Sequence, residues 1–401
     1  MILSVLTAPF GVNLRILKGI SSVVFLLALV GCASTDESTP EWAGVKNEDE
    51  PAKLVDFNET AQFNVLWQTN VGDSGANLLQ PAVTENAVYA VSVKGILSRL
   101  DRSTGKKVWR VETGLTISGG IGNGEGLLVI GGSKGDVLAY DETGKQVWKT
   151  HVSSEVLSVS PVSDGVVLVR SGDGRIAGLS AKDGSPVWVF ERSTPALVVR
   201  SHAGATIHRG VAFTGFAGGR LAAISISNGE VLWETSVSQP HGNTELERIS
   251  DITGNPIVDD EQICAIAFQG RMACYDLMQG SPLWTRDISS DKGMMLLRRY
   301  LYLSDARSAV MEMDKTSGNT VWKNDQLFMR GVSAPYVMED FVVVGDRQGY
   351  LHALSREDGS FVARMKLDGG AIKATMLDLD DGLLVQTSGG AVYALSINNR
   401  K

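Results

Sequence analysis

The chain has 401 residues, of which 43% are hydrophobic, and it carries a formal net charge of −8. A chain of this length can build one large repeat-based domain or two ordinary domains. Its acidic balance lacks the basic footprint of nucleic-acid-binding proteins, so the composition excludes nucleic acid as a partner class.

The first 31 residues are expected to be an export signal. Arg15 and Lys18 are the only charges there, and the apolar run at 20–30 is too short to span a bilayer. The sequence "LVGC", which ends at Cys32, resembles the lipobox of bacterial lipoproteins. That resemblance implies that residues 1–31 are removed as a signal peptide and that Cys32 carries lipid, including palmitate. An ordinary export signal followed by a chance cysteine is the alternative.

The residues after Cys32 bear on destination and flexibility. Ala33 and Ser34 stand where an aspartate would tend to retain a lipoprotein in the inner membrane, which favours the outer membrane. Residues 32–60 are largely polar and acidic, and we expect them to form a lipidated flexible tether.

Seven of the eight tryptophans recur at intervals of 38 to 51 residues, the scale of propeller blades. They are Trp67, Trp109, Trp148, Trp188, Trp233, Trp284 and Trp322. A glycine stands four residues before six of them, and the same spacing after Gly359 ends at Ala363. The tryptophans are predicted to be structural, each covering a turn and packing between neighbouring blades.

Each repeat predicts four short strands. In residues 155–191, alternating β-branched and small residues are separated by turns that contain Asp-Gly, a pattern typical of hairpins. Four such strands make one blade. The last repeat supplies only three strands, whereas residues 63–71 form a lone strand with a tryptophan. Pairing the two ends closes the ring, so residues 61–401 are predicted to form a single all-β, eight-bladed propeller.

The decamer "AYDETGKQVW" at 139–148 is typical of propeller dehydrogenases that use pyrroloquinoline quinone. Those enzymes also hold calcium and a catalytic aspartate, and many stack two adjacent cysteines on the quinone. This chain has three cysteines without a Cys-Cys pair, and its five histidines show no metal-ligand spacing. We therefore predict no catalytic, cofactor-binding or metal-binding residue. A quinone-dependent or sugar-handling periplasmic enzyme is the alternative function.

Cys264 and Cys274 lie on consecutive predicted strands of the fifth blade. In an oxidising periplasm they would form a cross-strand disulfide if the register places them opposite each other. A shift of one residue would place them on opposite faces of the blade. The sequence leaves both arrangements open.

The two longest intervals between tryptophans are candidates for function. Their extra residues fall at 191–210 and 238–256, in consecutive connections from the last strand of one blade to the first strand of the next. We expect both on the same side of the ring as neighbours, where long loops on a rigid scaffold commonly carry function. Drift in loop length without function is the alternative.

The lipobox, the acidic tether, the eight blades and "GNTELERISDITGNPIV" after the fourth blade together resemble the BamB family. Its members are lipoproteins of the outer-membrane β-barrel assembly machinery. The resemblance implies a non-enzymatic adaptor without a cofactor, lipid-anchored at the periplasmic face of the outer membrane. It would bind the POTRA domains of BamA, and through BamA the rest of the complex. It would assist folding and insertion of outer-membrane proteins, whose unfolded chains are a further candidate partner.

The family's partner contacts, carried over by position, fall on Leu197, Val199, Arg200 and Asp251. Val199 stands where the family has its second leucine, and Thr253 stands where it has a second aspartate. The missing carboxylate at Thr253 puts in doubt how much charge the interface uses. Asp251 would either meet a basic group on BamA or hold Arg200 in place from within.

Overall fold

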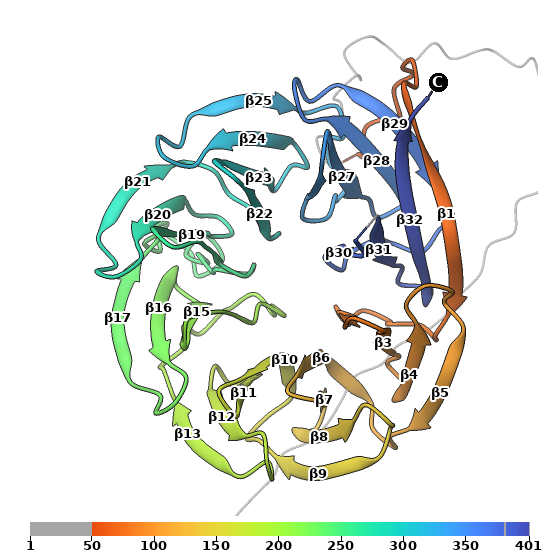
Figure 1. Ribbon diagram of the computed structural model, residues 1–401. Coiled ribbons are helices and arrows are strands. Elements are labelled where there is room, and N and C mark those ends of the chain that lie inside the picture. Colours follow the sequence, from red (N-terminus) through yellow and green to blue (C-terminus); the bar gives the residue numbers. More distant parts are fainter. Residues whose placement is uncertain (1–49, 381, 401) are drawn as a thin grey trace, which may run out of the picture. The chain divides into compact units, whose positions relative to one another are not determined.

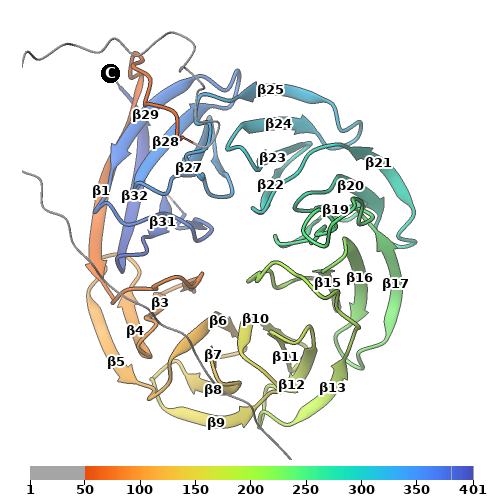
Figure 2. The ribbon, with the colours of Figure 1, turned by 180° about the vertical axis from the view of Figure 1, so that it is seen from behind.

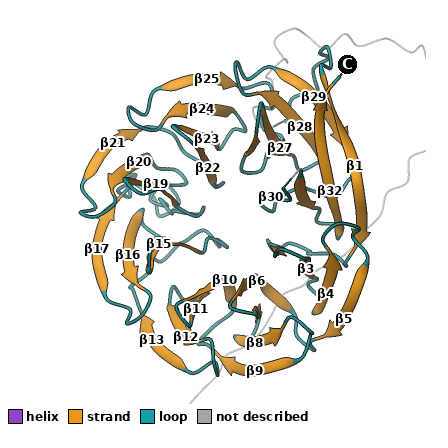
Figure 3. Cartoon of the chain, viewed as in Figure 1, coloured by secondary structure: helices purple, strands orange, loops and turns teal. Residues whose placement is uncertain are grey.

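The structure is a computed structural model that describes residues 50–380 and 382–400. All regular elements in these ranges are β-strands, and they form eight sheets of four strands each. The sheets surround a common centre as the blades of a propeller (Figures 1 and 3). The predicted all-β, eight-bladed propeller is confirmed. No helix in these two ranges is long and apolar enough to cross a membrane.

Seven blades are meanders of four consecutive antiparallel strands, with the fourth strand at the rim (Figure 1). Blade 1 comprises β2 (Ala82–Val83), β3 (Ala87–Val91), β4 (Ile96–Asp101) and β5 (Lys107–Glu112). Blade 2 comprises β6 (Ile117–Gly124), β7 (Leu127–Gly132), β8 (Asp136–Asp141) and β9 (Gln146–His151). Blade 3 comprises β10 (Val156–Ser163), β11 (Val166–Ser171), β12 (Ile176–Ser180) and β13 (Pro186–Phe190). Blade 4 comprises β14 (Ala205–His208), β15 (Val211–Phe216), β16 (Arg220–Ser225) and β17 (Val231–Ser236).

The remaining blades continue around the ring. Blade 5 comprises β18 (Ile257–Val258), β19 (Gln262–Ile266), β20 (Met272–Asp276) and β21 (Pro282–Arg286). Blade 6 comprises β22 (Met294–Leu297), β23 (Tyr300–Ser304), β24 (Val310–Asp314) and β25 (Thr320–Asn324). Blade 7 comprises β26 (Tyr336–Met338), β27 (Phe341–Gly345), β28 (Tyr350–Ser355) and β29 (Phe361–Lys366). Blade 8 comprises β30 (Leu377–Asp378), β31 (Leu383–Gln386), β32 (Ala391–Asn399) and β1 (Ala61–Asn70).

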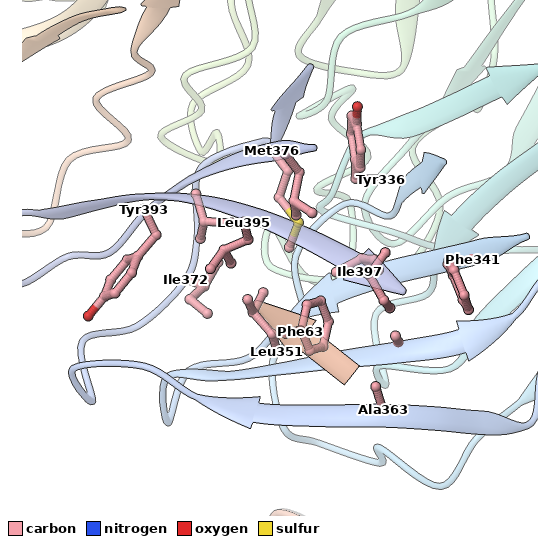
Figure 4. Close-up of a cluster of buried hydrophobic side chains, with 14 of the residues drawn as sticks. Phe63, Tyr336, Phe341, Leu351, Ala363, Ile372, Met376, Tyr393, Leu395 and Ile397 are labelled. Atoms are coloured by element: carbon pink, nitrogen blue, oxygen red, sulfur yellow. The ribbon is translucent and has the colours of Figure 1, made fainter. Parts of the chain in front are cut away.

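The eighth blade joins the two ends of the described chain. β1 pairs antiparallel with β32 from Ala61↔Asn399 to Asn70↔Ala391, and Figure 2 shows the two strands side by side at the rim. Phe63 of β1 packs in the hydrophobic cluster shared by blades 7 and 8 (Figure 4). The predicted closure of the ring by an N-terminal strand is therefore confirmed.

The recurring tryptophans connect neighbouring blades. The indole N–H of Trp148 in β9 donates to the carbonyl oxygen of Ala181 in blade 3 at 2.8 Å. Its ring covers Gly184, whose φ is +73° and where a Cβ would lie 2.5 Å from the ring, so this turn requires glycine. The other six repeating tryptophans donate in the same way to the carbonyl oxygens of Arg102, Glu142, Ile226, Leu277, Lys315 and Arg356. Their predicted structural role is confirmed.

The two cysteines of blade 5 form a disulfide. Cys264 of β19 lies directly opposite Cys274 of β20, with a Cα–Cα distance of 4.0 Å. Both side chains are buried in one hydrophobic cluster between blades 5 and 6. The hairpin register, which the sequence left open, therefore places both cysteines on the same face.

The predicted tether is only partly described. The signal peptide, Cys32 and residues 33–49 lie outside the described residues. Residues 50–60 lie against the propeller: the N–H of Ala52 donates to the carbonyl oxygen of Phe328 at 2.9 Å, and Phe57 contacts Phe361 with ring centroids 5.4 Å apart. The expectation of a flexible tether is corrected for these residues, because Val55 and Phe57 supply apolar side chains that pack beside blade 7.

Candidate partner-binding site

The two longest connections between blades lie side by side. Residues 191–204 join β13 to β14, and residues 237–256 join β17 to β18. The hydroxyl of Ser201 donates to the carbonyl oxygen of Thr253 at 2.9 Å, and the N–H of Gly204 donates to Asn255 Oδ1 at 2.7 Å. The predicted adjacency is confirmed, and we call these two segments the paired loops.

Asp251 fastens the paired loops from within. Its side chain is only 3% exposed. One carboxylate oxygen accepts the N–H of Val199 at 2.6 Å, and the other accepts the N–H of Gly218 at 2.9 Å. Asp251 faces inward, which favours the second alternative from the sequence, that it holds Arg200 in place from within, although its bond is to the main chain of Val199 and not to the Arg200 side chain. It thereby fixes the main chain immediately before Arg200.

A buried cation lies near this carboxylate. Arg170 of β11 donates to the carbonyl oxygens of Ala203 at 3.2 Å and Gly215 at 2.7 Å. Burial lowers the pKa of Arg170 to about 10, and the negative charge of Asp251 opposes that shift. Arg170 therefore stays charged at neutral pH, and the base of the paired loops contains a buried positive and a buried negative charge.

The first of the paired loops presents an apolar tip. Leu197 is 42% exposed and Val198 is 43% exposed, although both carry large hydrophobic side chains. Val199 is half-buried, and its N–H is held by Asp251. The outward apolar surface is therefore formed by Leu197 and Val198, and Val199 contributes less to it than the family pattern implied.

Arg200 is exposed but already paired within the chain. Its guanidinium contacts both carboxylate oxygens of Glu155, at 2.7 and 3.3 Å, and donates to Asn77 Oδ1 at 3.2 Å. Its side chain remains 46% exposed. A partner carboxylate would therefore meet an arginine that is already oriented, and it would have to compete with Glu155.

His202 is a further side chain that contacts the guanidinium of Arg200. Burial is the main cause that lowers the pKa of His202, so its ring is neutral at pH 7. Nδ1 lies 2.9 Å from the carbonyl oxygen of Leu157, and Nε2 lies 3.1 Å from Nη1 of Arg200. A neutral ring with its proton on Nδ1 satisfies both contacts, donating to Leu157 and accepting from Arg200.

This arrangement predicts acid sensitivity. Because the pKa of His202 is lower in the fold than its value of about 6.5 in an unfolded chain, acid favours unfolding. Stability should be complete above that unfolded value and fall as the pH drops below about 6.5, by at most about 1.4 kcal/mol per pH unit for one histidine. His352 in blade 7, whose pKa burial also lowers, should contribute in the same window.

The measurement is the free energy of unfolding in urea between pH 8 and pH 5. His202→Gln should show a shallower loss of stability in this range than the wild type. An identical pH slope in both proteins would contradict the neutral, buried state of His202. Carboxylates with lowered pKa values, such as Asp314 at about 2, lose their contribution only at lower pH and do not overlap this window.

In the second of the paired loops, one of the acidic side chains is hydrogen-bonded within the loop itself. Glu247 accepts the N–H groups of Asn243 and Thr244 at 2.7 and 3.1 Å, and these bonds hold the pKa of its carboxyl below the usual value. Glu245 is exposed and lies 3.7 Å from Arg248. Leu246, which lies between them in the sequence, is 67% exposed. The loop therefore presents one aliphatic side chain among charges.

The sequence did not identify several residues of this site. Asn77, Glu155 and His202 orient Arg200, yet they come from three separate connections and belong to no motif. Thr253, which replaces the family's second aspartate, has its hydroxyl buried without a hydrogen-bond partner among the described residues. Thr253 therefore supplies no negative charge at the position of the family's second aspartate.

No group of three or more histidine, cysteine, aspartate or glutamate side chains is placed to hold a metal ion within residues 50–380 and 382–400. The paired loops expose aliphatic side chains and an arginine, and hydrogen bonds to the main chain fix their conformation. Such a surface is typical of protein–protein contacts.

Comparison with known proteins identifies the family. The family model described as outer membrane protein assembly factor BamB matches residues 50–116, 93–324 and 326–401. The chain belongs to the BamB family. It is 40% identical over 405 residues to outer membrane protein assembly factor BamB of Nitrosomonas eutropha, covering 99% of each chain. It is 36% identical to the BamB of Burkholderia pseudomallei, covering 92% of this chain and 94% of the relative.

Solved structures agree on the fold. The crystal structure of BamB from Moraxella catarrhalis superposes with a TM-score of 0.77 at 25% identity, covering 83% of this chain and 99% of that one. A quinohemoprotein alcohol dehydrogenase from Comamonas testosteroni gives a TM-score of 0.68 at 13% identity, covering 83% of this chain and 76% of that one. The second likeness shows only a shared propeller, so it explains the quinoprotein-like decamer as blade architecture.

Proposed function

We propose that this protein is a non-enzymatic, lipid-anchored adaptor of the outer-membrane β-barrel assembly complex. It binds the POTRA domains of BamA through the paired loops, and through BamA it joins the rest of the complex. In this role it assists the folding and insertion of outer-membrane proteins at the periplasmic face of the outer membrane. No cofactor is required for such a role.

The observation that carries this proposal is the fixed geometry of the paired loops. Asp251 holds the main chain at Val199, while Leu197, Val198 and Arg200 remain accessible. Aliphatic anchors beside an oriented arginine form the kind of surface in which a few residues dominate binding. A preorganised loop also loses less conformational entropy when a partner binds.

Affinity purification tests the proposal directly. The tagged protein, solubilised from outer membrane in mild detergent, should co-elute with BamA, and a variant carrying Leu197→Ala with Arg200→Ala should lose most of that BamA. Absence of BamA from the wild-type eluate would contradict the proposed partner. Quinone absorbance in the purified protein, or calcium-dependent dye reduction, would favour an enzyme instead.

The proposed lipid anchor makes a separate prediction. Cys32→Ser should release the protein into the soluble periplasmic fraction or leave its signal peptide uncleaved, because no acyl chain can then be attached. One acyl chain binds membranes only marginally, whereas the expected three should hold firmly. Fractionation of cells followed by detection of the protein measures this. Wild-type protein that is washed from membranes by salt without detergent would contradict lipidation at Cys32.

A further inference from the structure

Blade 7 contains a buried ionic cluster outside the paired loops. Asp346 and His352 are fully buried, and Arg330 is 4% exposed. One carboxylate oxygen of Asp346 contacts Arg330 at 2.6 Å and His352 Nε2 at 3.1 Å, and the other accepts the N–H groups of Gln348 and Tyr350, each at 2.9 Å. Buried charges cost desolvation, so such a cluster is weak support for stability by itself.

The cluster extends to a second arginine at the rim. Nε of Arg364 in β29 donates to Nδ1 of His352 at 3.2 Å, which requires a neutral His352 whose proton is on Nε2 and donates to Asp346. Burial lowers the pKa of His352, in agreement with a neutral ring. The cluster therefore contains two positively charged arginines and one negatively charged aspartate, and its net charge is positive. Asp346 and His352 leave some guanidinium N–H groups of both arginines available for other partners.

The chain's own N-terminal segment uses those donors. Arg330 Nη1 donates to the carbonyl oxygen of Ala52 at 3.0 Å, and Arg364 Nη1 donates to that of Val55 at 2.9 Å. The guanidinium of Arg364 also lies near two rings that contact each other, 4.8 Å from the centroid of Phe57 and 5.3 Å from that of Phe361. Asp56 and Glu59 of the same segment add negative charge near Arg364. Residues 52–57, which we call the strap, therefore match the cluster in hydrogen bonding, aromatic contact and charge.

The strap determines where the preceding chain leaves the propeller. Ala52 is bonded to Phe328, which lies in the connection from β25 to β26. This connection joins an outer strand to the next inner strand, as both paired loops do, so all three emerge on the same side of the ring. Blade 7 and blade 3 lie on opposite sides of the ring (Figure 1). The exit of the chain and the start of the first of the paired loops thus lie on one face, at blades that face each other across the centre of the ring.

We propose that blade 7 is a docking site for the strap, and that docking makes the lipid-bearing chain leave the propeller at blade 7, across the ring from blade 3, where the first of the paired loops begins. The orientation towards the membrane rests on the lipid anchor proposed above, whereas the docking does not. Residues 33–49 then connect Cys32 to the strap, a stretch of chain whose contour length is at most roughly 60 Å. The ring then acts as a rigid arm between anchor and partner site.

Hydrogen exchange of the full mature protein in detergent micelles tests the docking. The peptide that contains Ala52, whose N–H donates to Phe328, should be protected, and Phe57→Ala should accelerate its exchange at least tenfold, while the β1–β32 ladder stays protected. Leu66→Ala, which truncates an exposed side chain of β1, is the matched control and should change neither region. Wild-type exchange of this peptide at the rate of an unstructured chain would overturn the proposal. Phe57→Ala leaves the blade's buried charges in place, so it avoids the misfolding that Arg330→Gln could cause.

Energy transfer in vesicles tests the orientation. Gln326→Cys at the strap side and Ser193→Cys at the paired-loop side each add a single free thiol for a donor dye, since Cys264 and Cys274 are disulfide-bonded and the thiol of Cys32 would carry the proposed lipid. With acceptor-labelled headgroups in phosphatidylethanolamine–phosphatidylglycerol vesicles, transfer should be stronger from position 326, and Phe57→Ala should reduce the difference. Equal transfer from both positions would overturn the proposal that the ring holds the paired loops farther from the membrane than the strap. Failure to co-float with vesicles would contradict the lipid anchor instead, and hydrogen exchange would still decide the docking.

Discussion

Deleting residues 61–71 should abolish the stable propeller, because it removes β1 and leaves β32 without a partner at the rim of blade 8. The deletion also removes Phe63 and Trp67, which are both 8% exposed, and the bond from Trp67 to the carbonyl oxygen of Arg102. Loss of one large buried aromatic side chain costs about 3–5 kcal/mol, against a typical total stability of about 5–15 kcal/mol. We expect aggregation, or a Tm lowered by roughly 10 °C or more.

Thermal melting followed by circular dichroism, together with size-exclusion chromatography, measures this effect. Deletion of residues 36–47 is the control, because it spares both the strap and β1, and it should leave the Tm unchanged. If both deletion variants have the same Tm as the wild type, β1 does not hold the ring closed.

Leu197→Ala and Arg200→Ala should each weaken binding to the POTRA domains of BamA by about 2 kcal/mol or more, roughly 30-fold in Kd. Both side chains are exposed on a connection between blades, so the Tm should change little. Leu232→Ala, which truncates an exposed side chain on the rim strand β17, is the matched control and should leave both quantities unchanged.

Asp251→Ala should behave differently from these contact variants. It removes two hydrogen bonds that main-chain N–H groups donate to a buried carboxylate, each worth about 1.5–3 kcal/mol, and leaves Arg170 without its nearby negative charge. We therefore expect it to lower both the free energy of unfolding and the affinity. A loss of affinity with an unchanged free energy of unfolding would mean that Asp251 contacts the partner directly.

The pairing of Arg200 with Glu155 can be tested in the same assay. If Glu155 orients Arg200, the double variant Glu155→Gln with Arg200→Ala should deviate from additivity by about 0.5–3 kcal/mol. Additive effects would assign Glu155 no role in positioning the arginine.

The sequence predicted the architecture because the fold depends on repeated residue types. Trp148 and Gly184 lie in adjacent blades but meet through a fixed spacing, and the same spacing recurs around the ring. The closure was predictable because the lone strand with Trp67 supplies the one strand that the last repeat lacks. The disulfide between Cys264 and Cys274 was not, because a register shift of one residue would reverse the face of one side chain.

The hydrogen bonds inside the paired loops could not be predicted from the sequence, for a different reason. Asp251 bonds to the main chain of Val199 and Gly218, and main-chain donors carry no residue-type pattern. Residues 52–57 were assigned to the tether because the acidic composition around them masks Val55 and Phe57. Only the structure brings these two side chains next to the arginines of blade 7.

Calorimetric titration of the purified protein with the POTRA domains of BamA tests the central claim most directly. The account predicts that the wild type binds, and that the variant carrying Leu197→Ala with Arg200→Ala binds more than 30-fold more weakly at an unchanged Tm, because roughly 30-fold is the loss expected from one such anchor alone. Equal affinity of the two proteins, or no binding by the wild type, would contradict it.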